Sequence, residues 1–156
     1  ADVFQSKKSF AKADAVELVE ASPSRRAHIW PAADIDKNPG GRPGGADYGH
    51  IIPAAQLRYK SQILAESMQK FAGVTIDEGL VKAIGEHDQG WRTRVDLHVG
   101  ESGFPGPYAE RTKNIIKVDE LPLATTAINE TEIHKQEFFG AQRIRVIDNR
   151  GEIRLV

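Results

Sequence analysis

The sequence predicts an α+β fold: helices packed on a small antiparallel sheet, with a C-terminal β-hairpin and two long loops rich in glycine and proline. Three observations support this prediction. Residues 53–71 carry apolar side chains at helical spacing, residues 92–99 alternate apolar and polar side chains, and residues 143–156 hold two short strand-like runs around a turn. The chain has 156 residues, enough for one core, so we expect residues 1–156 to form a single domain.

Composition excludes several classes of protein. The chain has no cysteine, which rules out disulfides, thiolate zinc sites and cysteine nucleophiles. Its 21 basic and 22 acidic residues nearly cancel, so a nucleic acid would need a local basic patch. No apolar run approaches the roughly 20 residues of a transmembrane helix, so we expect no membrane contact. Because the chain begins at Ala1 rather than at a methionine, we expect a module cut from the C-terminal end of a larger polypeptide.

The first half of the chain predicts two helices around one long loop. Residues 9–20 have apolar side chains at near-helical spacing and predict a short amphipathic helix. Residues 27–30 are a brief apolar run, which predicts a strand or a hydrophobic plug under the following loop. That loop, residues 34–47, is mostly Gly, Pro, Asn and Asp, and loops of this length are usually functional or mobile. Residues 53–71 then predict a helix that starts at a proline.

The second half predicts a further helix and most of the sheet. Residues 77–86 place apolar side chains on one helical face behind two acidic residues that suit the helix dipole. Residues 92–99 predict a half-buried strand, and residues 100–108 a second glycine- and proline-rich loop. Two shorter predictions are a strand at 114–118 and a helix at 125–139.

The C-terminal segment predicts the hairpin most clearly. Residues 143–147 and 152–156 flank a turn with the sequence Asp-Asn-Arg-Gly. The outward face would carry Arg143, Arg145 and Arg154, a small positive patch on rigid strands. Solvated arginines on an exposed sheet face are the commoner explanation of such a pattern.

The most informative segment runs from Gly40 to Pro53. Four glycines in positions 40–45 cannot fill a core, because glycine loses backbone entropy and buries no side chain. They predict a loop that bends sharply or allows a close approach. His50 follows this loop at the start of a short apolar run, and imidazole titrates near neutral pH. His50 is therefore a candidate general base or metal ligand.

Two further histidines lie near the second loop. His87 and Asp88 are adjacent and can supply two ligands to one divalent ion, although capping of a helix end also explains His87. His98 lies on the predicted strand and shares a face with Arg94. A functional site here requires His87 and His98 to converge.

The remaining histidines have weaker functional claims. His134 and Glu130 are one helical turn apart and could bind one metal together, although a solvated helix face is the commoner explanation. For His28, which stands in an apolar run, a packed structural role is favoured.

The run Asp-Tyr-Gly-His-Ile-Ile-Pro that ends at Pro53 resembles the Gly-His catalytic segment of the ββα-metal nucleases, the group that includes HNH enzymes and non-specific endonucleases. The resemblance implies that His50 activates water as general base, with Asn129 and His134 as ligands of one divalent cation. It covers a small part of the chain, and the family places its metal-binding helix sooner after the histidine.

A cysteine-free module with such a segment also resembles the C-terminal toxin domains of bacterial competition proteins. That resemblance implies a nuclease that is secreted or delivered and acts in the cytoplasm of a target cell. It also implies a cognate immunity protein as a partner.

The sequence therefore predicts a nuclease, a hydrolase that cleaves DNA or RNA, with His50 as general base. The positive centre would be a Mg²⁺ or Zn²⁺ ion, for which Asp88 is a third candidate ligand, or arginines such as Arg94. One alternative is a metal-free ribonuclease that uses His87 or His98 with a cation such as Lys113. Another is a non-enzymatic module whose two glycine- and proline-rich loops grip a protein partner.

Overall fold

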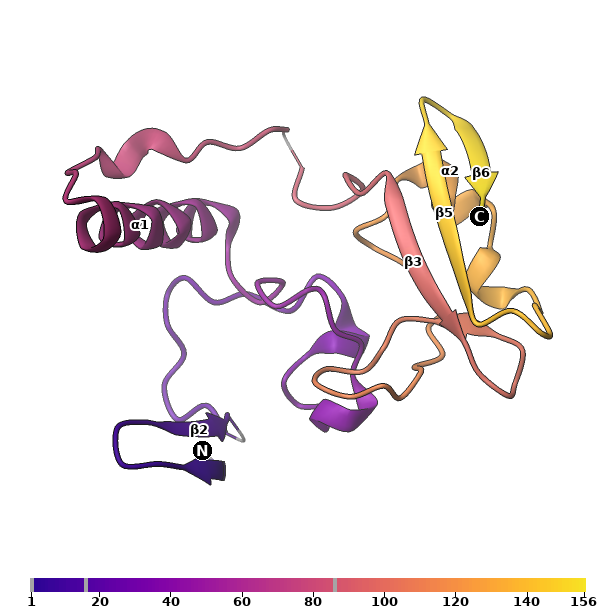
Figure 1. Cartoon of the computed structure of the whole chain (residues 1–156), viewed down its shortest axis with the longest axis horizontal. Helices are drawn as coiled ribbons and strands as arrows, with labels where there is room; N and C mark the ends of the chain where they lie inside the picture. Colours follow the sequence, from indigo (N-terminus) through magenta and orange to yellow (C-terminus); the bar gives the residue numbers. More distant parts are fainter. Residues whose placement is uncertain (1, 16, 86) are drawn as a thin grey trace.

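The computed structural model describes residues 2–15, 17–85 and 87–156. Figure 1 shows a four-stranded sheet at one side of the molecule and, at the other side, a long helix and a separate two-stranded hairpin. The α-helices are α1 (Pro53–Ala72) and α2 (Thr126–Glu130). The strands are β1 (Asp2–Ser6), β2 (Ala11–Asp14), β3 (Arg94–Val99), β4 (Pro105–Gly106), β5 (Arg143–Asn149) and β6 (Glu152–Leu155). Short 3-10 helices span Pro31–Ala33, Pro39–Gly41, Glu78–Leu80 and Ile133–Lys135.

The predicted α+β class is confirmed. The larger sheet has the strand order β4-β3-β5-β6, and each neighbouring pair is antiparallel. Alternate residues of β3 and β5 face the core, because side chains of a strand point to opposite faces in turn. The core combines these strand residues with α2 and with loops: Val95, Leu97, Ile144, Val146, Ile128, Ile133, Trp30, Leu121 and Leu123.

The C-terminal hairpin is confirmed, and its turn explains why it forms. Arg150 and Gly151 have φ angles of 56° and 92°, and positive φ at both central residues is the geometry that fits the twist of two antiparallel strands. The carboxylate of Asp148 accepts a hydrogen bond of 2.6 Å from the Gly151 amide, which fixes the turn.

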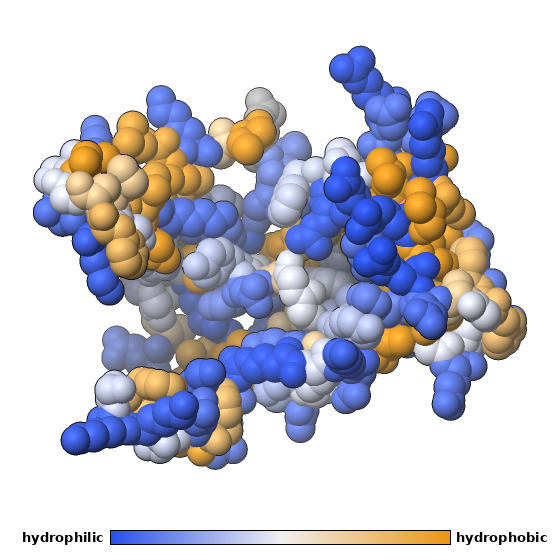
Figure 2. Space-filling view, in the orientation of Figure 1, coloured by the Kyte–Doolittle hydropathy of each residue, from blue (hydrophilic) through white to orange (hydrophobic). Residues whose placement is uncertain are grey.

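The long helix is also confirmed. Pro53 occupies its first turn, where no amide partner is needed, and Gly73 ends it in the left-handed region at φ 66°. Figure 2 shows apolar side chains on this part of the molecule. Ile63, Leu64 and Phe71 of this helix are exposed. None of the helices in the described ranges has both the length and the apolarity needed to cross a bilayer.

Two predicted helices, over residues 9–20 and 77–86, are wrong. Residues 11–14 form β2, which pairs with β1. The prediction failed because a short apolar run fits both the helical and the strand periodicity. Val16, part of the same prediction, lies outside the described residues. In residues 77–86 only Glu78–Leu80 is helical, as one 3-10 turn, and Gly79 and Gly85 lower the helix propensity of this segment. Glu86 also lies outside the described residues.

Three other predictions are confirmed only in part. The helix predicted over 125–139 ends at Glu130, because Glu132 adopts a left-handed φ of 48°. The strand predicted over 114–118 is reduced to a single bridge between Ile115 and Tyr108. Residues 27–30 are not a strand, but Trp30 is 5% exposed in the core, so the plug interpretation is confirmed.

Candidate functional site

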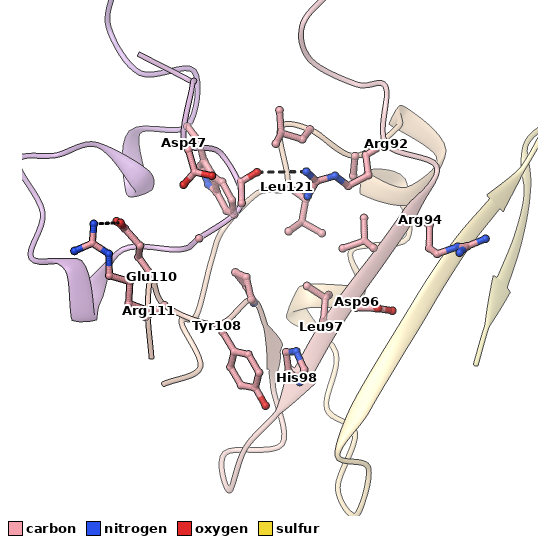
Figure 3. A pocket seen from close by; sticks show the side chains of 18 residues that line it. Asp47, Arg92, Arg94, Asp96, Leu97, His98, Tyr108, Glu110, Arg111 and Leu121 are labelled. Atoms are coloured by element: carbon pink, nitrogen blue, oxygen red, sulfur yellow. Dashed lines mark hydrogen bonds and ion pairs between the residues drawn. The ribbon is translucent and has the colours of Figure 1, made fainter. Parts of the chain in front are cut away.

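A groove follows one edge of β3. It consists of two hollows, of about 530 and 350 Å³, that share Gly45, Asp47 and Leu123 as lining residues. The walls are β3, the glycine-rich loop and the segment around residues 107–111, and Leu121, Leu123 and Ala124 add an apolar surface (Figure 3). The groove therefore brings together segments that are far apart in the sequence.

The edge of β3 is open inside the larger hollow. At one end Arg92 bridges Ala124, and at the other end His98 pairs with Gly106 of β4. The backbone of Thr93 and that of Val99 bond to the β5 side, at 2.8 and 3.0 Å. Because hydrogen-bonding direction alternates along an antiparallel strand, the peptide groups of Arg94 and Asp96 point to the opposite side, into the groove. Two residues are too few for an added strand but offer polar backbone groups to a ligand.

Aromatic rings stand at both ends of the groove. The rings of His98 and Tyr108 stack with a centroid distance of 3.5 Å and an interplanar angle of 11°, at the lower end of the view in Figure 3. In the smaller hollow, Tyr48 is 39% exposed and Trp91 is 57% exposed. Exposed aromatic rings in a hollow are suited to stack on flat ligands.

Cations lie beside these rings. The guanidinium of Arg92 is 5.2 Å from the Trp91 ring centroid and donates a hydrogen bond of 3.3 Å to the Gly45 carbonyl, drawn in Figure 3. The ammonium of Lys60 is 5.7 Å from the centre of the Tyr48 ring. Cations over aromatic faces are held by the ring quadrupole and stay available to an anion.

Most of the carboxylates around the groove are neutralised. Arginines pair with three of them: Asp88 with Arg26, Asp96 with Arg145, and Glu110 with Arg42 and Arg111. Across residues 2–15, 17–85 and 87–156, no ion pair involves Arg92, Arg94, Lys60 or Asp47. Within the described chain, Arg92 and Lys60 are thus unpaired cations beside the groove, against the one unpaired carboxylate of Asp47, whereas the Arg94 side chain points away from the groove (Figure 3). This balance favours an anionic ligand.

The glycine-rich segment is explained by its geometry. Gly45 has φ 90°, a conformation that other residues rarely adopt, and Gly44 passes so close to residue 108 that its amide bonds the Tyr108 carbonyl at 3.0 Å. Gly49 faces the ring of His28, where a Cβ atom would lie 2.3 Å from Cε1. The predicted sharp bend and close approach are therefore both present.

His50 lies next to the groove in a separate hollow of about 150 Å³, half-buried, together with His28, Arg42 and Glu110. Its ring centroid is 6.3 Å from that of His28. Burial lowers the pKa of His50, and the nearby positive charge of Arg25 lowers it further. His50 therefore lies beside one cationic and one anionic side chain, Arg42 and Glu110.

The packed role favoured for His28 is confirmed. The ring is 7% exposed, its Nδ1 accepts a hydrogen bond of 2.9 Å from the Trp30 amide, and its Nε2 lies 3.1 Å from the Ala46 carbonyl. Both nitrogens are therefore engaged by the backbone.

The candidate metal ligands do not meet. The side-chain amide of Asn129 forms hydrogen bonds with the backbone of Leu121, Ala124 and Thr125. His134 is 3% exposed, and its Nε2 lies 2.8 Å from the Asp119 carbonyl oxygen. Asp88 instead pairs with Arg26. In the described ranges, no three His, Asp or Glu side chains are grouped so that they could hold a metal ion.

The residues of the ribonuclease alternative are also separated. His98 and Arg94 line the groove, but Lys113 lines another hollow, between residues 100–104 and 113–117. His87 is exposed on the segment before β3 and lines neither hollow of the groove. Burial lowers the pKa of His98, and so does the positive charge of Arg143.

The positive patch predicted on the hairpin is partly neutralised. Arg145 forms two hydrogen bonds with Asp96, at 2.7 and 2.9 Å, and Arg154 pairs with Glu152. Two of the three arginines are thus paired with carboxylates, and Arg143 is exposed.

Sequence reasoning missed Trp91, Tyr48 and Lys60 as site residues. The signal available was local: an aromatic residue directly before Arg92, and another within the glycine-rich segment. Aromatic and basic residues interleaved near a loop are typical of nucleic-acid surfaces.

The stability of the fold is expected to decrease as the pH falls below about 6.5, the ordinary pKa of histidine. His50 and His98 have pKa values below the ordinary 6.5, so their neutral forms are favoured in the folded chain. Below pH 6.5 the two histidines bind protons more readily in the unfolded chain than in the folded chain. Their contribution to the free energy of unfolding is therefore complete above pH 6.5 and is lost as the pH falls toward the lowered pKa values of the folded chain. Urea unfolding at a series of pH values measures this. The double variant His50→Gln/His98→Gln should show a flatter dependence, and an unchanged dependence would contradict the assignment.

Comparison with known proteins finds bacterial RNA methyltransferases. The chain is 31% identical to an uncharacterized RNA methyltransferase of Streptomyces coelicolor over 152 residues, which is 91% of this chain and 32% of that protein. It is 30% identical to an uncharacterized RNA methyltransferase of Bifidobacterium longum over 155 residues, 92% of this chain and 35% of that protein. A 23S rRNA (uracil(1939)-C(5))-methyltransferase of Shewanella denitrificans is 35% identical over 124 residues, 75% of this chain and 25% of that protein. No protein-family model matches the chain.

These relatives overturn the predicted function. They are named as transferases that act on RNA, so the prediction of a nuclease was wrong, and so was the hydrolase class. The toxin role, from which the immunity partner was inferred, is wrong as well. The nuclease roles given to the histidines lapse with it. The chain spans about a third of the length of the curated relatives that it matches in Streptomyces and Bifidobacterium.

Proposed function

We propose that the chain is an RNA-binding part of an RNA methyltransferase, and that the groove along β3 holds a single-stranded segment of the substrate RNA. The observation that carries the proposal is the similarity to RNA methyltransferases over 91% of the chain. The groove supports it, because proteins that bind single-stranded nucleic acid combine a basic channel with exposed aromatic rings.

An unpaired RNA segment fits the groove better than a duplex does. Sequence-specific RNA recognition relies mostly on unstacked bases that meet aromatic side chains and arginine planes. Here the aromatic rings lie inside hollows of about 350 and 530 Å³, where a splayed base has access. Arg92 stands between the two ends and can contact a phosphate while its plane lies near Trp91.

We assign the methyl-transfer chemistry to other parts of the polypeptide. Nucleotide-like cofactors bind mainly at the carboxyl ends of parallel strands, at a glycine-rich turn that leads from a strand into a helix. In the described residues the paired strands are antiparallel, and the glycine-rich segment enters α1 without a preceding strand of the sheet. These residues therefore do not fit a methyl donor.

The proposal predicts that binding of a short single-stranded RNA weakens in the variant Arg92→Gln. Each lost phosphate contact lowers the slope of log affinity against log salt by about 0.7. Fluorescence anisotropy with a labelled RNA at several salt concentrations measures both the affinity and the slope.

The matched control is Arg150→Gln, which removes an exposed arginine in the β5–β6 turn that lines neither hollow of the groove. It should leave affinity and slope nearly unchanged. Equal losses in the two variants would contradict binding in the groove, and no RNA binding by the unaltered chain would contradict the proposed function.

A further inference from the structure

We propose that the smaller hollow of the groove, between Tyr48 and Trp91, takes one unpaired RNA base that stacks on the indole of Trp91. This inference rests on the proposed function and specifies where in the groove a base is bound. It is supported by the exposure of the two rings, the hydrogen bonds that hold them and the cations beside them.

The indole of Trp91 is exposed yet held in place. Its Nε1 donates a hydrogen bond of 3.2 Å to the Asp88 carbonyl, and the Asp88 carboxylate pairs with Arg26. Arg26 in turn donates from Nε to the Gly49 carbonyl at 3.1 Å, which ties this support to the glycine-rich segment. A ring that is 57% exposed but fixed by such a chain loses little freedom when a base stacks on it.

Tyr48, on the other wall, is fixed through its backbone. The side-chain amide of Gln56, on α1, donates to the Tyr48 carbonyl at 3.0 Å and to the Ile51 carbonyl at 2.9 Å. The two walls therefore belong to different segments, each anchored by a polar side chain.

The interior between the walls suits a flat ring with a polar edge. Ile29, Ala46 and Leu123 line it with apolar surface, while Asp47 and Lys60 add polar groups. Its volume of about 350 Å³ lies in the lower part of the range of small-ligand sites, which run from roughly 300 to 1,000 Å³. Lys60 and Arg92, each near a ring face, provide cations for the phosphates on either side of the base.

Tryptophan fluorescence gives a direct test, because the chain has two tryptophans and they differ in exposure. Trp30 is 5% exposed in the core, whereas Trp91 is 57% exposed in the hollow. Addition of a ten-nucleotide oligouridine should quench the Trp91 emission, and the quenching should be absent in Trp91→Phe. An oligomer of the same length without bases should bind more weakly and cause little quenching.

Affinities of variants complete the test. Trp91→Ala should weaken binding of the oligouridine by about 5- to 150-fold, the range found for loss of one stacked base, and Trp91→Phe should retain most of the affinity. Phe71→Ala, which removes an aromatic ring that is 80% exposed on α1, is the matched control and should leave affinity unchanged. If RNA binds but Trp91→Ala binds equally well and no quenching occurs, the stacking site is wrong while the proposed function stands. If the unaltered chain binds no RNA, both are wrong.

Discussion

Replacement of Leu97 by alanine is expected to lower the free energy of unfolding by about 2–5 kcal/mol. Leu97 is 0% exposed at the middle of β3, opposite Ile144 of β5, so its removal leaves a cavity in the centre of the core. Urea denaturation followed by circular dichroism gives the change. Leu97 also lines the groove, which forms only in the folded chain. The apparent RNA affinity should therefore decrease under conditions where part of the variant is unfolded.

The matched control for this prediction is Leu64→Ala. Leu64 lies on α1, is 39% exposed and has no place in the core, so its replacement by a good helix former should change the unfolding free energy by less than about 1 kcal/mol. Similar losses in the two variants would show that β3 is not at the centre of the core.

Replacement of Gly49 by alanine is expected to destabilise the fold by about 1–3 kcal/mol. The new Cβ would lie 2.3–2.8 Å from three atoms of the His28 ring, which is buried and held by two hydrogen bonds. The ring must move and weaken those bonds, each of which contributes about 0.5–1.5 kcal/mol. Thermal and urea unfolding of the variant measure the loss.

Two comparisons make this second prediction specific. Gly41→Ala adds a Cβ with no atom within 4 Å and should be nearly neutral. The double variant His28→Ala/Gly49→Ala should lose less stability than the sum of the two single variants, because removal of the ring removes the clash. Strict additivity would show that the contact between Gly49 and His28 is not the cause.

The contact between Gly49 and His28 also explains why sequence reasoning reached the wrong function. A glycine before His50 looked like part of a catalytic segment, whereas in the fold the glycine gives room to a buried ring. Both a catalytic segment and a tight packing contact can require glycine at position 49. Only the contact with His28, 21 positions earlier in the chain, shows which requirement applies. Seven residues were too few to specify a family.

Elements with strong periodicity and definite turn chemistry could be predicted. The helix between Pro53 and Gly73 and the hairpin around Gly151 have both, and they are present. Residues 9–20 and 77–86 lack them, so tertiary pairing and glycine decided their structure. The groove is harder still, because Tyr48 and Trp91 face one hollow only after three segments have packed together.

The side chain of Asn129 has a consequence for the surface that lies beneath the proposed RNA. Its Nδ2 group donates to the carbonyls of residues 121, 124 and 125 at 3.0, 3.2 and 3.3 Å, and its Oδ1 accepts from the amide of residue 121. The amide group of Asn129 thus helps to hold the backbone of Leu121 and Ala124, two of the apolar residues that line the groove. Aspartate has nearly the same shape as asparagine, but its carboxylate has no N–H group to donate. At position 129 it would replace three hydrogen bonds to carbonyls by repulsions between oxygen atoms, so this position accepts the shape of aspartate but not its charge.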